Sequence, residues 1–107
     1  MYRTHNLGEL RISDVGKQVT LAGWLNSVRD LGAVIFLTMR DFYGITQIVV
    51  SDVSLMQQVR TIPRESTIMV KGTVLERKDK NPKLPTGDIE ISPEYIEILG
   101  KCSEQLP

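Results

Sequence analysis

Alternation of side-chain character along residues 33–40 is the feature that most limits what this chain can fold into. Successive side chains of a strand point to opposite faces, so Ile35, Leu37 and Met39 predict a core-facing side. The same period places Phe36 on the outward face. An outward aromatic is suited to stacking on an unpaired nucleic-acid base. An ordinary core position at a bulge or a register shift is the alternative interpretation.

Apolar and polar side chains alternate in four other segments, which are therefore also expected to be strands. These are residues 17–26, 45–51, 67–76 and 89–99, the last interrupted near Pro93. The two neighbouring strands within residues 33–51, joined by a short connection, are expected to form a hairpin. Residues 52–59 change to helical spacing, with Val53, Leu55, Met56 and Val59 on one face, and Pro63 prevents continuation. A short helix or an irregular lead-in is expected over residues 8–16, and a polar loop over residues 77–87.

This order predicts an all-β fold: strand, strand, strand, helix, strand, strand. It fits the five-stranded Greek-key barrel of the OB-fold, which carries a helix between strands three and four. A generic small β-barrel and a five-stranded sandwich are the competing architectures.

Composition narrows the functional classes. A chain of 107 residues with 41% apolar content supports one domain with a modest core. No apolar run approaches the roughly 20 residues needed to span a bilayer, so no membrane association is expected. Cys102 and His5 are the only residues of their types, which argues against disulfides, thiolate clusters and histidine-based metal or acid–base sites, and favours a cytoplasmic location. No enzyme motif is present.

Charge is balanced overall but uneven along the chain. Residues 71–83 contain five basic and two acidic side chains, so an anionic partner would meet a local basic patch.

Four polar side chains are candidates for contacts with a nucleic acid, each with a plainer alternative. The amide of Gln47, in an otherwise apolar strand, suits hydrogen bonding to the edge of a base, or is simply solvated. Arg29 is a candidate phosphate or base contact, or a solvated charge. Asn81 is either a base contact in the polar loop or a turn former before Pro82. Glu90 either accepts hydrogen bonds from guanine or occupies an outward strand position.

Motifs distributed over the whole chain carry a resemblance to a known family. They include Gly8-Glu9-Leu10-Arg11, Gly23-Trp24, Arg29-Asp30-Leu31-Gly32, Ile35-Phe36, Met39-Arg40-Asp41, Gly44-Ile45-Thr46-Gln47, Gly72-Thr73-Val74, Lys80-Asn81 and Thr86-Gly87-Asp88-Ile89-Glu90. Together they closely resemble the N-terminal domain of bacterial-type aspartyl-tRNA synthetase, a class II aminoacyl-tRNA synthetase.

The resemblance implies an OB-fold over residues 1–100 that binds the anticodon loop of aspartate tRNA. It assigns Phe36 to stacking on the middle uridine and Gln47 to hydrogen bonding with that base. The remaining assignments place Arg29, Arg77 and Asn81 near the third anticodon base and Glu90 near the first. Apart from the resemblance, Trp24 is expected to be a structural anchor near the barrel surface, with a stacking role as the alternative.

The resemblance also implies what lies beyond the chain. Residues 101–107 are expected to begin a linker to a catalytic domain, which would use ATP and magnesium to attach aspartate to tRNA in a cytoplasmic homodimer. No cofactor is expected in residues 1–107, and these residues alone are expected to be catalytically inert.

Two departures from the family pattern are expected to leave fewer charged side chains around Phe36. Ser27 and Val28 stand where the family commonly has arginines, and Thr38 stands where it has an aspartate, which also leaves the orientation of Arg40 open. Two other functional classes remain: a free-standing OB-fold module that binds single-stranded nucleic acid, and a domain serving mainly subunit contact. Acceptance of asparagine tRNA is also open, and Leu31 lies in the turn most relevant to it.

Overall fold

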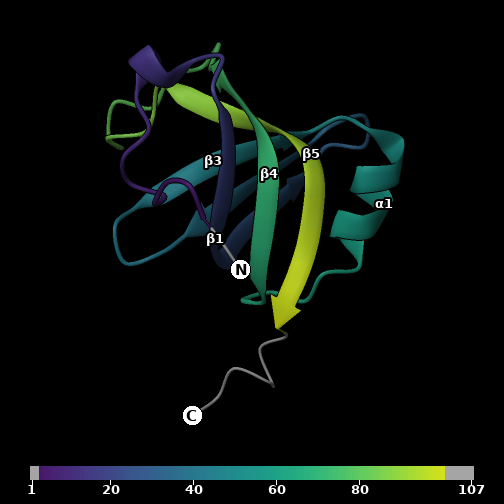
Figure 1. Cartoon of the computed structure of the whole chain (residues 1–107). Coiled ribbons are helices and arrows are strands. Elements are labelled where there is room, and N and C mark those ends of the chain that lie inside the picture. The colour runs from purple at the N-terminus through teal and green to yellow at the C-terminus, as the bar shows by residue number, and fades with distance from the viewer. Residues whose placement is uncertain (1–2, 101–107) are drawn as a thin grey trace.

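The computed structural model describes residues 3–100, so the predicted linker over 101–107 and Cys102 lie outside the described residues. Within them the chain forms five strands, one α-helix and one short 3-10 helix (Figure 1). Their bounds are η1 (Ile12–Asp14), β1 (Gln18–Asp30), β2 (Ile35–Arg40), β3 (Ile45–Val50), α1 (Val53–Arg60), β4 (Thr67–Glu76) and β5 (Ile89–Gly100). None of the described helices is long and apolar enough to cross a membrane.

The five strands close into a barrel in the order β1-β2-β3-β5-β4, with β4 returning to pair with β1. All neighbouring strands are antiparallel except β3 and β5, which run parallel over two residue pairs, Gln47 with Glu90 and Ile48 with Ile91. The helix lies between β3 and β4 in the chain. The predicted five-stranded OB-fold architecture is therefore confirmed.

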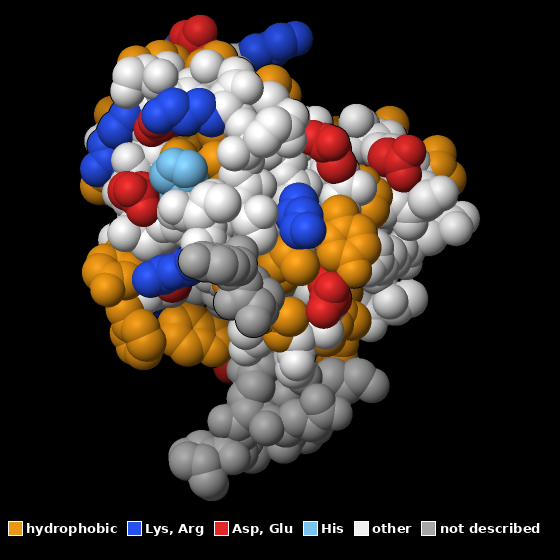
Figure 2. Space-filling view, in the orientation of Figure 1, with side chains coloured by type: hydrophobic (Ala, Val, Ile, Leu, Met, Phe, Trp, Pro, Cys, Tyr) orange, Lys and Arg blue, Asp and Glu red, His pale blue; other side chains and the backbone are white. Residues whose placement is uncertain are grey.

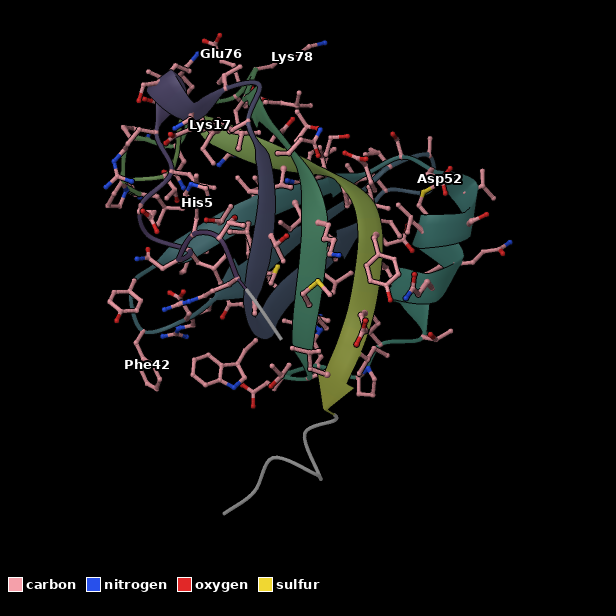
Figure 3. All side chains as sticks on the ribbon, in the orientation of Figure 1. His5, Lys17, Phe42, Asp52, Glu76 and Lys78 are labelled. Atoms are coloured by element: carbon pink, nitrogen blue, oxygen red, sulfur yellow. The ribbon has the colours of Figure 1, made fainter. Side chains whose placement is uncertain are left out.

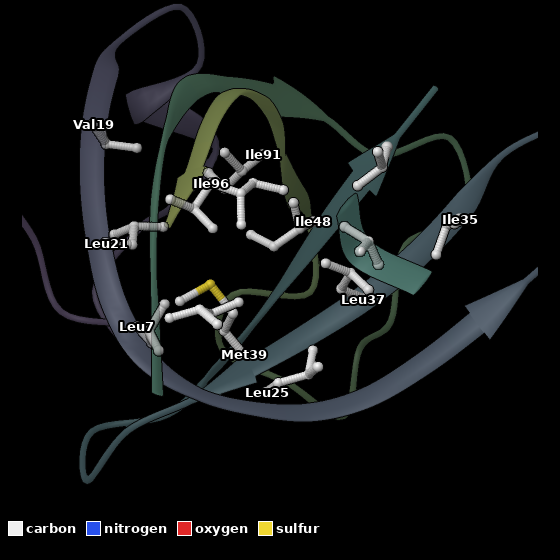
Figure 4. Close-up of a cluster of buried hydrophobic side chains, with 14 of the residues drawn as sticks. Leu7, Val19, Leu21, Leu25, Ile35, Leu37, Met39, Ile48, Ile91 and Ile96 are labelled. Carbon is white, nitrogen blue, oxygen red and sulfur yellow. The ribbon is translucent and has the colours of Figure 1, made fainter. Parts of the chain in front are cut away.

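The barrel interior is filled by the inward positions predicted from strand alternation (Figure 4). Ile35, Leu37 and Met39 of β2 are fully buried, whereas Phe36 is only partly buried on the other side of the strand. The lead-in is irregular apart from η1, yet it contributes fully buried Leu7 to this core. An apolar anchor from outside the strands therefore completes the core.

Hydrogen bonds hold this lead-in against the β2–β3 turn. The Leu7 backbone N–H donates to Asp41 Oδ2 at 2.9 Å, and the Leu7 carbonyl accepts from the buried Thr46 hydroxyl at 2.7 Å. Asp41 Oδ1 also accepts from the backbone N–H groups of Tyr43 and Gly44, at 2.7 and 3.0 Å. One carboxylate therefore joins the turn to the N-terminal segment.

A bulge in β1 has the largest consequence for the outer surface. The strand was expected to end near Asn26 but continues to Asp30, with a register shift between Leu25 and Ser27. A bulge inserts one residue and so reverses the alternation beyond it. As a result Ser27 and Arg29 face outward, although simple alternation from buried Leu25 would have turned them inward.

Two further expectations need correction. The β5 strand is continuous through Pro93, because a register shift opposite Lys71 and Gly72 accommodates the proline. Val53 is 64% exposed, and the buried residues of α1 are Met56 and Val59. The helix contacts the barrel by a narrower face than predicted, so Val53 in its first turn is left in solvent.

Candidate nucleic-acid interface

Two neighbouring rows of side chains run across the outer face of the barrel. Cross-strand pairing places Arg29, Phe36 and Val49 in one row. The next row crosses all five strands and consists of Ser27, Thr38, Gln47, Glu90 and Leu75. Both rows lie on the side opposite the core, so their side chains are free to meet a ligand.

These rows form the floor of a groove of about 670 Å³, whose wall is the chain leaving β4. The lining residues are Ser27, Arg29, Leu31, Phe36, Thr38, Gln47, Val49, Leu75, Glu76, Arg77, Lys78, Asp79 and Glu90. Five of the six predicted site residues are among them. The exception is Asn81.

Phe36 is the only aromatic side chain among the described residues that line the groove. It is half-buried, with Arg29 opposite it on β1 and Val49 opposite it on β3. The prediction that Phe36 faces outward is confirmed. Its ring can therefore offer a stacking surface without leaving the core short of an apolar group.

Gln47 and Glu90 meet where the barrel closes. Gln47 Nε2 donates to Glu90 Oε1 at 2.9 Å, and both residues are partly buried. An ionised carboxylate only accepts hydrogen bonds, so the amide must turn its amino group toward it. Two side chains assigned to different bases are thus in direct contact before any ligand arrives.

The charges of the groove are mixed in sign. Arg29, Arg77 and Lys78 line it together with Glu76, Asp79 and Glu90. Figure 3 shows Glu76 and Lys78 at the far end of the molecule from Phe42. Among the described residues, no hydrogen bond or ion pair is formed by the guanidinium of Arg29 or Arg77. These two cations are therefore available to phosphate or base oxygens.

An ion pair beside the groove reduces the effective charge of its wall. Lys80 Nζ donates a hydrogen bond to Glu76 Oε2 at 2.7 Å, and this bond to the carboxylate raises the pKa of Lys80. Lys80 therefore compensates the negative charge of an acidic residue in the wall.

Residues 3–100 contain no group of three His, Cys, Asp or Glu side chains arranged to hold a metal ion.

Asn81 organises the loop between β4 and β5. Its Oδ1 accepts from the Lys83 backbone N–H at 3.0 Å, and its backbone N–H donates to the Gly87 carbonyl at 2.9 Å. A Cβ atom at position 87 would overlap the Asn81 carbonyl, so the loop closes this tightly only around glycine. These contacts match the turn-forming interpretation of Asn81. A base contact by its side chain stays a prediction.

The turn between β1 and β2, which lines the groove with Leu31, is tied to α1. Arg60 Nε and Nη2 donate to the two carboxylate oxygens of Asp30 at 2.8 and 3.2 Å, and Nη2 also donates to the Gly32 carbonyl at 3.2 Å. The hydrogen bond from Arg60 is the main reason that the pKa of Asp30 is lowered. This clamp holds the turn that presents Leu31 to the groove.

The two departures from the family pattern lie opposite each other. Ser27 pairs with Thr38, and their hydroxyl oxygens are 2.6 Å apart. Asn26 Nδ2 also donates to Thr38 Oγ1 at 3.0 Å, and Arg40 Nη1 donates to Asn26 Oδ1 at 3.5 Å. A neutral hydroxyl pair with its own hydrogen bonds therefore occupies the position beside Gln47.

Of the three apolar lining residues, the sequence pointed only to Leu31, for its place in the turn, and the prediction did not include Val49 and Leu75. The alternation of β3 and β4 contained the signal for two of them. Val49 and Leu75 stand at outward positions next to buried Ile48 and Val74.

A separate aromatic cluster lies at the β2–β3 turn. Trp24 and Phe42 meet edge to face with ring centroids 5.2 Å apart, and Arg3 lies 5.4 Å from the centroid of Tyr43. Phe42 is 91% exposed and labelled in Figure 3. Figure 2 shows hydrophobic side chains gathered at the lower left of a face that otherwise mixes both charge signs. Trp24 contacts the turn, in keeping with the predicted anchoring role.

Comparison with known families agrees with this geometry. Residues 19–99 match the family described as OB-fold nucleic acid binding domain. The chain belongs to this family. Its outer groove lies on strands that such domains use for binding oligonucleotides.

Individual relatives extend the comparison. The chain is 46% identical over 107 residues to an aspartate–tRNA ligase of Mesoplasma florum, which covers 100% of this chain and 18% of the relative. It is 50% identical over 111 residues to an aspartate–tRNA(Asp/Asn) ligase of Thermotoga neapolitana, covering 100% of this chain and 19% of the relative. The crystal structure of asparaginyl-tRNA synthetase from Pyrococcus horikoshii superposes with a TM-score of 0.75 at 30% identity, over 91% of this chain and 23% of that one. The chain thus spans about a fifth of the length of these curated relatives.

Proposed function

We propose that this chain binds the anticodon loop of aspartate tRNA as the N-terminal domain of an aspartate–tRNA ligase. The observation that carries the proposal is the outward Phe36 beside the Gln47–Glu90 pair, in a groove on the outer face of an OB-fold barrel. Whole-chain identity to aspartate–tRNA ligases supports the choice of tRNA.

The groove supplies one kind of contact for each anticodon base. The middle uridine stacks on Phe36 and hydrogen-bonds Gln47, while the first base, a guanosine, donates to Glu90. Arg29 of β1 and Arg77, which directly follows β4, lie near the third base and its phosphates. Asn81 contributes near that base by holding the loop in shape. The neutral Ser27–Thr38 pair lowers phosphate affinity without removing base reading.

The remaining functions are proposed for the whole protein. A catalytic part outside residues 1–107 would attach aspartate to tRNA using ATP and magnesium, in a cytoplasmic homodimer. The anticodon domain would then hold the tRNA so that its acceptor end reaches that part.

Titration with short RNA hairpins tests the proposal. A hairpin with the loop anticodon GUC should bind more tightly than one with the same bases scrambled, and both should weaken as salt rises. A free-standing single-strand-binding module would bind the two almost equally. Equal affinities would therefore reject anticodon recognition. A GUU hairpin as a third arm reports whether the third base is read.

A further inference from the structure

The Gln47–Glu90 contact has a consequence for specificity that neither residue would have alone. We propose that Glu90 is a positioning residue for Gln47, so that Glu90 governs discrimination at the middle base as well as at the first. This inference rests on the proposed function, because it concerns how the same groove distinguishes bases.

Barrel closure brings the two side chains together. Gln47 and Glu90 are 43 positions apart, yet they face each other at the two-pair parallel junction of β3 and β5. The bond from Gln47 Nε2 to Glu90 Oε1 is 2.9 Å long. Among the described residues, it is the only hydrogen bond that either side chain makes, and no described cation forms an ion pair with Glu90. Nothing within residues 3–100 competes for this contact.

The chemistry of the pair fixes the amide in one orientation. Turning Gln47 over would set its carbonyl oxygen against the carboxylate of Glu90, two acceptors with no proton between them. The neighbour on the other strand, Thr38, does not oppose this choice, because its hydroxyl is engaged with Ser27 and Asn26. Gln47 therefore keeps Oε1 and one N–H for a ligand, in a defined order.

A defined order of acceptor and donor distinguishes classes of bases. Uracil and guanine carry an N–H at the centre of the Watson–Crick edge, whereas cytosine and adenine carry a lone pair there. A pyrimidine stacked on Phe36 is held in a fixed plane, so Oε1 of Gln47 accepts from uracil and opposes the lone pair of cytosine. If Glu90 were absent, the amide could turn over and accommodate either base. Discrimination at the middle base would then fall.

The test compares hairpins with the anticodons GUC and GCC, which stack similarly but differ at the central N–H. Wild-type protein should prefer uridine by roughly tenfold, as for a well-placed bidentate contact. Glu90→Ala should reduce that preference to about threefold or less, and Glu90→Gln should reduce it as well, because its amide can accept or donate and so lets Gln47 turn over. The double variant with Gln47→Ala should show the same preference as Gln47→Ala alone. An unchanged preference in Glu90→Ala would overturn the proposal.

A measurement without RNA separates this proposal from the proposed function. In wild-type protein the side-chain amide protons of Gln47 should be shifted by the carboxylate, and Glu90→Ala should move them toward free-glutamine values. Gln58 donates to the Ile96 carbonyl at 2.7 Å and serves as an internal control whose signals should not move. Unmoved Gln47 signals would reject the positioning role. Equal binding of GUC and scrambled hairpins would reject anticodon recognition and, with it, the inference that Glu90 governs discrimination at the middle base.

Discussion

Phe36→Ala isolates the contribution of stacking to binding. The ring lies outside the core, between Arg29 and Val49, while the adjacent inward residues Ile35 and Leu37 are fully buried. Removing the ring therefore leaves the barrel interior intact. A base stacked on an aromatic side chain is worth roughly 1–3 kcal/mol. Since about 1.4 kcal/mol is a factor of ten, the Kd for a GUC hairpin should rise by about one to two orders of magnitude.

Fluorescence anisotropy with a labelled GUC hairpin at fixed salt measures this change, and thermal unfolding checks that the variant is folded. Phe36→Leu is the matched control, because leucine keeps an apolar side chain but has no aromatic face. It should bind nearly as weakly as Phe36→Ala, whereas Phe36→Trp should bind at least as well as wild type. Leu75→Ala, at the other side of the groove, should have a smaller effect.

Two results would refute the reasoning. Folded Phe36→Ala that binds the hairpin as tightly as wild type would show that no base stacks on this ring. Phe36→Leu with wild-type affinity would show that apolar contact, and not aromatic stacking, holds the base.

Three further predictions concern the framework around the groove. Asp41→Ala removes the shared acceptor of the turn and the lead-in, and should lower the free energy of unfolding by about 2–3 kcal/mol in denaturant titrations; no loss would contradict its joining role. Thr46→Val leaves the buried Leu7 carbonyl without its hydroxyl donor and should cost about 1–3 kcal/mol in the same assay, with Thr46→Ser as the control that keeps the donor. Because Arg60 lowers the pKa of Asp30, their pair stabilises the fold above the ordinary carboxyl pKa and stops doing so as pH falls through the lowered value. The Tm difference between wild type and Asp30→Asn should therefore shrink between about pH 6 and about pH 2, and a constant difference would argue against it.

Local periodicity was enough to predict most elements of this fold. Three of these features are the alternation around Phe36, the change of period at residues 52–59 and the polar loop after β4. Each depends only on the polarity and spacing of residues that are neighbours in the sequence. Even the orientation of Phe36 followed, because a strand side chain can only face one of two sides. The end of β1 was predicted wrongly. A bulge such as the one at Asn26 depends on pairing with the partner strand, which local periodicity does not reveal.

The candidate site was predicted less completely than the fold. Arg29, Phe36, Gln47, Arg77 and Glu90 do line one groove, but Asn81 is used within its own loop. Its role depends on Gly87, whose lack of a side chain lets the loop close. The burial of Leu7 could not be predicted either, because the neighbouring residues in the sequence do not show that an apolar side chain is needed to complete the barrel core.

The sequence by itself determined an all-β fold with an aromatic ring on the outer face of its sheet. Only the tertiary structure decided what stands beside that ring. Gln47 and Glu90 are separated by 43 positions, and they meet because β3 and β5 pair in parallel where the barrel closes. Strand period specifies which face a side chain takes, but register between distant strands is set by how the whole core packs. The partnership that orders the donor and acceptor of Gln47 is therefore a property of the closed barrel.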